Sequence, residues 1–197
     1  MSMHECLIAF LEANQVQYRK VTHEALGKSE EIAKIRGNEL DHSAKAMLLS
    51  AKVKSQEAPK HYLVVLPGNC QFDSKALKKD LKGDGVQSLS IESNVTGLTG
   101  CVTGAVPPFS LWPGISLLVD SRLATLPQAD EIVFNAAELT SSLFISVKDY
   151  LRAANPRVLS FAIDKKPSVL EAPHHAMFQP NEADIERVVE QSIPQQH

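Results

Sequence analysis

The chain lacks the features that would mark it as secreted or membrane-spanning. Its 197 residues include three cysteines, Cys6, Cys70 and Cys101, and this odd number at wide spacing favours reduced thiols over a disulfide framework. Glycines, prolines and hydroxyl residues interrupt the long uncharged stretch before it reaches the roughly 18 to 20 apolar residues that a spanning helix needs. Glu5 and Glu12 break up the first apolar residues, so we find no signal-peptide pattern. We therefore expect a cytoplasmic protein without a membrane partner.

Familiar metal-binding and catalytic motifs are also absent. His174 and His175 are adjacent, but no second histidine or cysteine pair lies at ligand spacing, so we expect no metal and no other cofactor. The sequence has no Walker loop, no nucleophile elbow and no C-x-x-C pair. The formal net charge of −3 provides no overall positive field, so a nucleic-acid partner would need a local basic face.

The composition is that of an ordinary globular protein. Hydrophobic residues make up 44% and charged residues 22% of the chain, enough to form a sizeable core. From residue 165 onward the composition changes, because four of the eleven prolines lie there. We therefore predict one domain over residues 1–164 and an appended tail, residues 165–197, with a short helix at 182–192.

Hydrophobic periodicity predicts both strands and helices, without a regular alternation of the two. This mixture favours an α+β domain. The expected helices cover residues 3–14, 29–37, 74–82 and 147–155, and the expected strands cover 16–23, 44–53, 61–67, 86–91, 115–120, 131–135, 143–147 and 158–163.

One uncharged stretch combines the most flexible and the stiffest residues of the chain. It reads GLTGCVTGAVPPF over residues 97–109 and holds three of the nine glycines, followed by Pro107 and Pro108. Glycine permits positive φ and a close approach to the backbone, while proline fixes φ and removes an N–H donor. The combination indicates a buried or half-buried loop with a shaped backbone surface.

Lys45 is the most informative charged residue. In AKAMLLSAKV (44–53), period-2 alternation places it on the same strand face as Met47 and Leu49. A lysine that begins an apolar face either reaches water at a rim or points into a cavity. Inside a cavity its ammonium would be a fixed positive charge for a carbonyl or phosphate oxygen.

Two further features allow two interpretations each. Asn135 ends the strand EIVFN, and with Glu138 it forms a capping-box pattern, so it either caps a helix or points its amide into a pocket. Asp73 begins a helix with a lysine stripe that is either a solvated face or a contact for nucleic-acid phosphates. The stripe consists of Lys75, Lys78, Lys79 and Lys82.

Five ordered segments resemble the YbaK/ProRS-associated domain family of aminoacyl-tRNA deacylases, and within it the freestanding YeaK-type, ProXp-like deacylases. The resemblance covers about residues 4 to 163 and excludes the tail. It implies an α+β fold with a mixed, partly barrel-like sheet flanked by helices. It also implies trans-editing of mischarged tRNA, of the Ser-tRNA and Thr-tRNA type. The segments are VTHEALGKSEEIAKIRG, SAKAMLL, TGLTGCVTGAVPPFSLWPG, DEIVFNAAEL and KDYLRAANP.

The resemblance assigns roles by position. It makes Lys45 the residue on which deacylation depends and Gly104 the start of a G-x-x-x-P loop that shapes the aminoacyl pocket. Asn135 matches a pocket position, and His23 matches a common histidine without a clear role. Relatives often read N-A-G where this chain has Asn135-Ala136-Ala137, a change that we expect to alter the turn. The full set of implied substrate-binding residues is His23, Gly100, Ala105, Val106, Pro107, Pro108, Phe109 and Asn135.

The chemistry of ester hydrolysis is consistent with this implied function. Backbone N–H groups of the glycine-rich loop can stabilise a tetrahedral oxyanion, each donor contributing roughly 100- to 1,000-fold in rate. No side chain is an evident general base, and the resemblance implies that the terminal ribose hydroxyl of the tRNA helps to activate water. The expected partners are the mischarged tRNA acceptor end and an aminoacyl-tRNA synthetase. The alternative is a non-catalytic module that binds an aminoacylated end or a synthetase.

Overall fold

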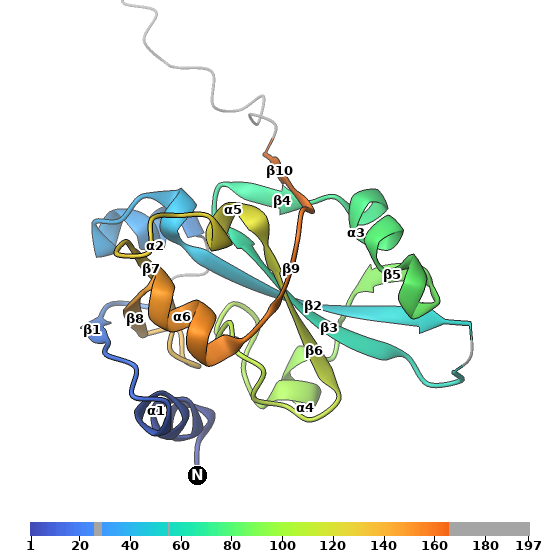
Figure 1. Cartoon of the computed structure of the whole chain (residues 1–197). Coiled ribbons are helices and arrows are strands. Elements are labelled where there is room, and N and C mark those ends of the chain that lie inside the picture. The colour runs from blue at the N-terminus through green and yellow to red at the C-terminus, as the bar shows by residue number, and fades with distance from the viewer. Residues whose placement is uncertain (26–28, 55, 166–197) are drawn as a thin grey trace, which may run out of the picture. The chain divides into compact units, whose positions relative to one another are not determined.

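The computed structural model describes residues 1–25, 29–54 and 56–165, with the side chains of 29–32 excepted. The predicted tail helix at 182–192 therefore lies outside the described residues. Within them, helices and strands are mixed as an α+β domain requires (Figure 1). The helices are α1 (Met3–Ala13), α2 (Ser29–Arg36), α3 (Ser74–Asp80), α4 (Val95–Thr99), α5 (Ser121–Ala124) and α6 (Val147–Ala154), with 3-10 turns η1 (Leu40–His42) and η2 (Lys82–Asp84).

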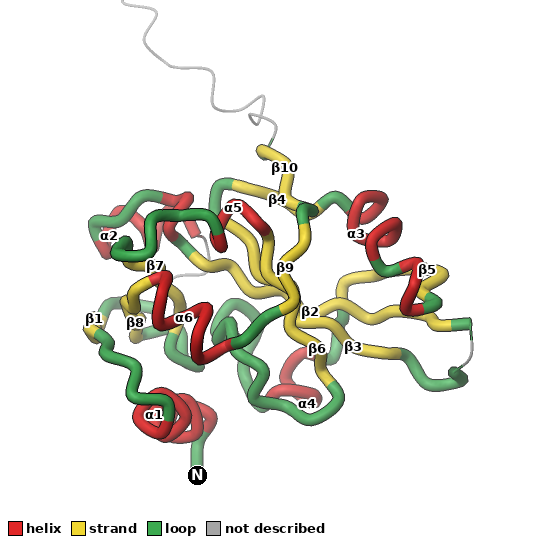
Figure 2. Tube along the Cα trace, viewed as in Figure 1, coloured by secondary structure: helices red, strands yellow, loops and turns green. Residues whose placement is uncertain are grey.

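A mixed five-stranded sheet, in the order β5-β2-β3-β6-β9, forms the centre of the domain (Figure 2). β2 is antiparallel to β3 and β5, whereas β6 is parallel to β3 and β9. The expected pairing of the two longest apolar strands is confirmed, with Lys45 opposite Leu66 and Leu49 opposite Tyr62. The strands are β2 (Ala44–Val53), β3 (Lys60–Pro67), β5 (Val86–Ile91), β6 (Ile115–Asp120) and β9 (Arg157–Leu159).

Two smaller sheets complete the strand set. β1 (Arg19–Thr22), β8 (Ser141–Ser146) and β7 (Glu131–Asn135) form an antiparallel sheet in the order β1-β8-β7. β4 (Cys70–Phe72) pairs antiparallel with β10 (Ala162–Asp164). A single parallel bridge between Ser43 and Val133 brings the start of β2 beside β7.

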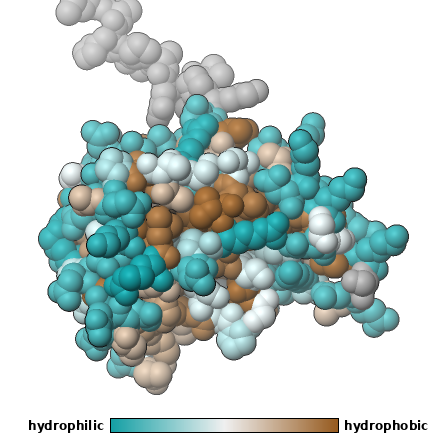
Figure 3. Space-filling view, viewed as in Figure 1, coloured by the Kyte–Doolittle hydropathy of each residue, from teal (hydrophilic) through white to brown (hydrophobic). Residues whose placement is uncertain are grey.

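The side-chain alternation of the central strands separates two apolar clusters. On β2, Leu48 belongs to an apolar cluster that includes residues of α1, α6 and the β1-β8-β7 sheet. Leu49 belongs to a second apolar cluster, which includes Leu77 of α3. In Figure 1, α3 lies on one side of the central strands and α4 on the other. Leu77 and Leu81 are fully buried, as the amphipathic pattern predicted. Figure 3 shows apolar atoms gathered around β9 on one face, with hydrophilic groups around them.

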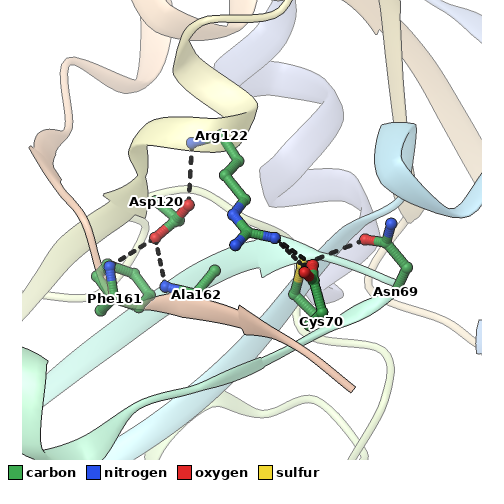
Figure 4. A network of polar contacts seen from close by, with 7 residues as sticks. Asn69, Cys70, Asp120, Arg122, Phe161 and Ala162 are labelled. Atoms are coloured by element: carbon green, nitrogen blue, oxygen red, sulfur yellow. Dashed lines mark hydrogen bonds and ion pairs between the residues drawn. The ribbon is translucent and has the colours of Figure 1, made fainter. Parts of the chain in front are cut away.

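The segment expected as one strand at 158–163 is divided into β9 and β10. The cause is Asp120, which is 1% exposed. One carboxylate oxygen accepts from Phe161 N–H at 2.7 Å and Ala162 N–H at 2.6 Å, and the other accepts from Arg122 N–H at 2.9 Å (Figure 4). The N–H groups of Phe161 and Ala162 bond the Asp120 side chain and not a neighbouring strand, and from Ala162 onward the chain pairs with β4.

The glycine-rich stretch also differs from a simple loop. Its first part forms α4, whose N-cap Asn94 accepts from Gly97 N–H at 3.2 Å. Gly100 ends this helix with φ +69°, a left-handed conformation that favours glycine. The loop proper therefore begins after α4.

Candidate active site

A cavity of about 370 Å³ lies along the first half of β2. It is bounded by the loop after α4, the end of β7 and the last residue of α2. Its described lining residues are Arg36, Ser43, Ala44, Lys45, Ala46, Met47, Thr103, Gly104, Val106, Val133, Phe134 and Asn135.

The cavity exists because one edge of β2 is open there. β5 pairs with β2 only from Leu49 onward, whereas β3 pairs along the other edge from Ala44. Leu48 C=O accepts from Glu92 N–H on the β5 side, so by strand alternation the backbone polar groups of Ala46 point to the same side. The small side chains of Ala44 and Ala46 keep this edge accessible.

Lys45 lines the cavity and is held in place by a backbone carbonyl. Its Nζ donates to Cys70 O at 2.5 Å, which ties β2 to β4. Of the two alternatives that the sequence left open, the cavity position is therefore observed. Arg122 Nη1 contacts the Cys70 thiol at 3.3 Å (Figure 4). Burial raises the pKa of that thiol, with Arg122 opposing the shift, so Cys70 is held as a neutral thiol.

Gly104 gives the loop its shape at the cavity. Its φ is +88°, which a residue with a Cβ rarely adopts. Its carbonyl accepts from Asn135 Nδ2 at 2.7 Å, and the next turn is closed by Ala105 N–H donating to Val102 O at 3.0 Å. The loop is therefore fastened to the end of β7, at the cavity that Lys45 also lines.

Asn135 does not cap a helix, so that interpretation of the capping-box pattern is wrong. β7 ends at Asn135 and a turn leads to β8, without a helix between them. A carbonyl can only accept, so the bond to Gly104 O fixes Nδ2 toward the loop and Oδ1 toward Arg36, whose Nη2 donates to it. The amide therefore points into the cavity region, the other alternative that the sequence allowed.

His23 does not line the cavity, but Ser142 connects it to Asn135. His23 Nε2 lies 2.6 Å from Ser142 Oγ, which lies 3.3 Å from Asn135 Oδ1. His23 Nδ1 lies 2.8 Å from Glu24 O, so Nδ1 carries a proton. The Ser142 hydroxyl therefore lies within hydrogen-bonding distance of both His23 and Asn135.

The turn after Asn135 keeps a glycine-like conformation without glycine. Ala137 has φ +63°, and His4 Nδ1–H donates to Ala136 O at 2.7 Å. Lys20 Nζ lies 3.2 Å from His4 Nε2 and 3.9 Å from Glu138. These contacts from α1 and β1 hold the turn in place, and the positive φ places backbone strain at Ala137.

Arg36 is a cavity residue that sequence reasoning missed. At the C-terminal end of a helix it has the position of a solvated cation, which is where basic residues favour the helix dipole. Its Nε is instead enclosed without a hydrogen-bond partner among the described residues. Burial lowers the pKa of Arg36 to about 10, so the guanidinium is charged at neutral pH. Ser142, fully buried, was also missed, because it lies within an apolar strand.

The other predicted substrate-binding residues do not line the cavity. Phe109 is fully buried and packs against Phe10, Phe134 and Tyr150 with ring centroids 5.3 to 5.5 Å apart. Tyr150 O–H donates to Pro108 O at 3.0 Å, which anchors the loop on α6. The cavity brings together four of the predicted site residues, Lys45, Gly104, Val106 and Asn135. The predicted site residues that do not line it are His23, Gly100, Ala105, Pro107, Pro108 and Phe109.

The four-lysine stripe, which extends from α3 to the start of η2, lines a separate hollow of about 450 Å³ together with Val86. α3 lies near β5, away from β7 and α2 (Figure 1). The lysines of the hollow are Lys75, Lys78, Lys79 and Lys82.

The described residues also bear on other classes of function. No group of three or more histidine, cysteine, aspartate or glutamate residues among them is placed to hold a metal ion. No helix of the described chain has the length and apolar character to span a membrane.

Comparisons with known proteins identify related sequences. The sequence model of the aminoacyl-tRNA editing domain matches residues 23–153. Relatives from Escherichia coli strains K12 and O157:H7, each named multifunctional Ser/Thr-tRNA deacylase ProXp-y, are 40% identical over 158 residues, which cover 80% of this chain and 92% of theirs.

Two solved structures share the fold. One, a hypothetical protein named APE2540, is 21% identical with a TM-score of 0.68 and covers 80% of this chain and 99% of its own. The other, described as a candidate trans-editing enzyme for prolyl tRNA synthetase, is 19% identical with a TM-score of 0.63 and covers 84% of this chain and 99% of its own.

Proposed function

Because the chain belongs to the aminoacyl-tRNA editing domain family, we propose that it is a trans-acting deacylase that hydrolyses mischarged aminoacyl-tRNA. The observation that carries the proposal is one cavity at which a tethered ammonium, Lys45, lies beside the positive-φ loop at Gly104. Seryl-tRNA and threonyl-tRNA are the proposed substrates, since the relatives at 40% identity are named for them.

The proposed reaction adds water to the ester carbonyl and then breaks the bond to the ribose oxygen. The products are the free amino acid and the ribose hydroxyl. Negative charge develops on the carbonyl oxygen in the tetrahedral intermediate, and a fixed cation or backbone donor stabilises it most in a site that excludes water. Lys45 Nζ is the proposed cation. Gly104 N–H is the proposed backbone donor, since it donates to no other residue that the structure describes.

Asn135 supports this arrangement by positioning. Its Nδ2 holds Gly104 O at 2.7 Å, so the loop cannot move away from β7 without breaking that bond. Ala44 and Ala46 on one wall and Val106 on the other leave room for a small side chain. A small pocket discriminates by size, and one methylene changes binding by only about 1 to 3 kcal/mol. A separate editing enzyme therefore has a role wherever a synthetase mischarges.

The lysines of the α3 hollow are the proposed contact for the tRNA backbone. Lysine binds phosphate as a point charge without reading sequence, so such a contact would position the acceptor end. An aminoacyl-tRNA synthetase is the proposed second partner, from which the mischarged product would be received.

The first experiment measures deacylation of Ser-, Thr-, Ala- and Cys-charged tRNA by the wild type, Lys45→Ala and Lys52→Ala. Lys52 is the matched control, an exposed lysine on the same strand. We expect hydrolysis of one or two substrates, a loss of roughly 100-fold or more in Lys45→Ala, and no change in Lys52→Ala. Saturable binding without turnover by the wild type would instead show a non-catalytic binding module.

A further inference from the structure

Arg36 lines the cavity, yet the reaction proposed above gives it no task. We propose that Arg36 is a substrate-binding residue whose guanidinium holds the phosphodiester group on the 5′ side of the terminal adenosine. This inference rests on the proposed function, because it names the anionic part of the substrate that the same cavity receives.

The first argument is the donor inventory of Arg36. A guanidinium has five N–H donors and no acceptor. Nη2 donates to Asn135 Oδ1, and Nε is enclosed with no partner among the described residues. Arg36 also forms no ion pair with a described carboxylate, and burial lowers its pKa to about 10 without an opposing acid. A half-buried charge with incomplete hydrogen bonding and no counter-charge destabilises the free protein, so this arrangement fits a site whose anion arrives with a ligand.

The second argument is the chemistry of the substrate. In an aminoacyl ester the carboxylate has been consumed, and the α-amino group is a cation, so the aminoacyl part brings no negative charge. None of the described residues that line the cavity is acidic. The anion nearest to the ester along the tRNA chain is the terminal phosphodiester. A guanidinium binds two phosphate oxygens through parallel N–H groups, a geometry that lysine cannot provide.

The third argument is that the guanidinium is already oriented. Asn135 Oδ1 accepts from its Nη2, while Asn135 Nδ2 bonds Gly104 O. The Asn135 side chain therefore bonds both the proposed phosphate-binding group and the loop beside the ester, and it fixes their relative positions. Lys34, in the same helical turn, is exposed and does not line the cavity. It provides a matched control for the loss of one positive charge.

The test compares two ester substrates, one without and one with the 5′ phosphodiester and the cytidine that it carries. These are the seryl ester of adenosine and the seryl ester of the dinucleotide cytidylyl-(3′→5′)-adenosine. We expect Arg36→Gln to lower kcat/KM for the dinucleotide ester by about 10- to 100-fold, the range for a lost charge-assisted contact. The adenosine ester should change little in the same variant. Lys34→Gln should match the wild type on both, and Arg36→Lys should keep part of the preference.

Equal losses on the two esters in Arg36→Gln would overturn the proposal, since they would show that Arg36 acts only by positioning Asn135. A second measurement needs no turnover: NMR titration of the wild type with uncharged dinucleotide and with adenosine. Tighter binding of the dinucleotide, lost in Arg36→Gln, is expected. Equal affinities in the wild type would overturn the proposal even if the variant did not fold. Failure to hydrolyse any ester would contradict the proposed function. The NMR titration alone would then test whether Arg36 binds the phosphodiester.

Discussion

Asp120 is a buried charge and Arg36 is a half-buried charge of the opposite sign, and their hydrogen bonding differs. Asp120 accepts three backbone N–H bonds and joins β6, α5 and the start of β10. Arg36 has one hydrogen-bonded partner, Asn135, and a buried Nε without any among the described residues. A buried charge whose bonds are complete stabilises the fold, whereas one whose bonds are incomplete is available to a ligand. The number of satisfied donors and acceptors thus distinguishes a structural charge from a binding charge.

The largest expected effect tests the structural side of this comparison. Asp120→Ala leaves the N–H groups of Arg122, Phe161 and Ala162 without their acceptor, and we expect a loss of about 2 to 5 kcal/mol in the free energy of unfolding. Urea denaturation measures it. Asp73→Ala is the control, since Asp73 caps α3 at a less buried position, and it should cost about 1 kcal/mol. Equal losses would show that burial of Asp120 adds nothing.

A second variant gives Arg36 the acid that it lacks. Asn135→Asp keeps an acceptor for Arg36 but removes the donor to Gly104 O. We expect unchanged or raised thermal stability, because the guanidinium gains a carboxylate, and a loss of about 10-fold in deacylation, because the loop is released. Thermal unfolding measures the change in stability, and single-turnover hydrolysis measures the change in deacylation. A variant that loses stability and keeps activity would contradict both roles assigned to Asn135.

A third change concerns strain beside the cavity. Ala137 has φ +63°, so Ala137→Gly should relieve the left-handed strain and raise the free energy of unfolding by about 0.5 to 1 kcal/mol, after the greater entropy of unfolded glycine is subtracted. The melting temperature reports it. Ala136→Gly, at a fully buried neighbour without positive φ, should be destabilising. A lower melting temperature for Ala137→Gly would show that the turn is not strained.

The smallest effect is a pH dependence on the cavity side of the domain. Burial would lower the pKa of His42, but hydrogen bonds with Asp41 and Asp130 outweigh it, and the pKa is raised. The resulting stabilisation is present below the unfolded-state pKa of about 6.5 and is lost as pH rises through the higher folded value. We expect at most about 0.5 kcal/mol. His42→Gln should remove this slope between pH 6 and 8, and an unchanged slope would assign it to other groups.

Much of the fold could be predicted because local pattern and tertiary structure agree. The α+β class and the family resemblance are confirmed, and the apolar alternation of β2 predicted which face Lys45 shares. The glycine segment predicted a shaped loop, and Gly104 has the positive φ that this requires.

The errors arose where distant residues decide the local structure. Asn135 matches a capping box, yet Gly104, 31 residues earlier in the chain, takes its amide donor. The sequence does not show that Arg36 turns inward, because the orientation of α2 is set by packing and not by its own composition. Residues 158–163 have the composition of one strand, but Asp120 breaks it in two.

The tether of Lys45 has a mechanical consequence. Lys45 Nζ is held by Cys70 O at 2.5 Å, Cys70 pairs with Asp164 at the end of the β4–β10 ribbon, and Lys165 N–H donates to Asn69 O at 3.3 Å. A force applied to the chain beyond residue 165 therefore loads this ribbon first, and the ribbon carries the carbonyl that restrains the ammonium. A partner that pulled on the chain beyond residue 165 would therefore strain the hydrogen bonds of the β4–β10 ribbon, which carries the carbonyl that holds Lys45 Nζ.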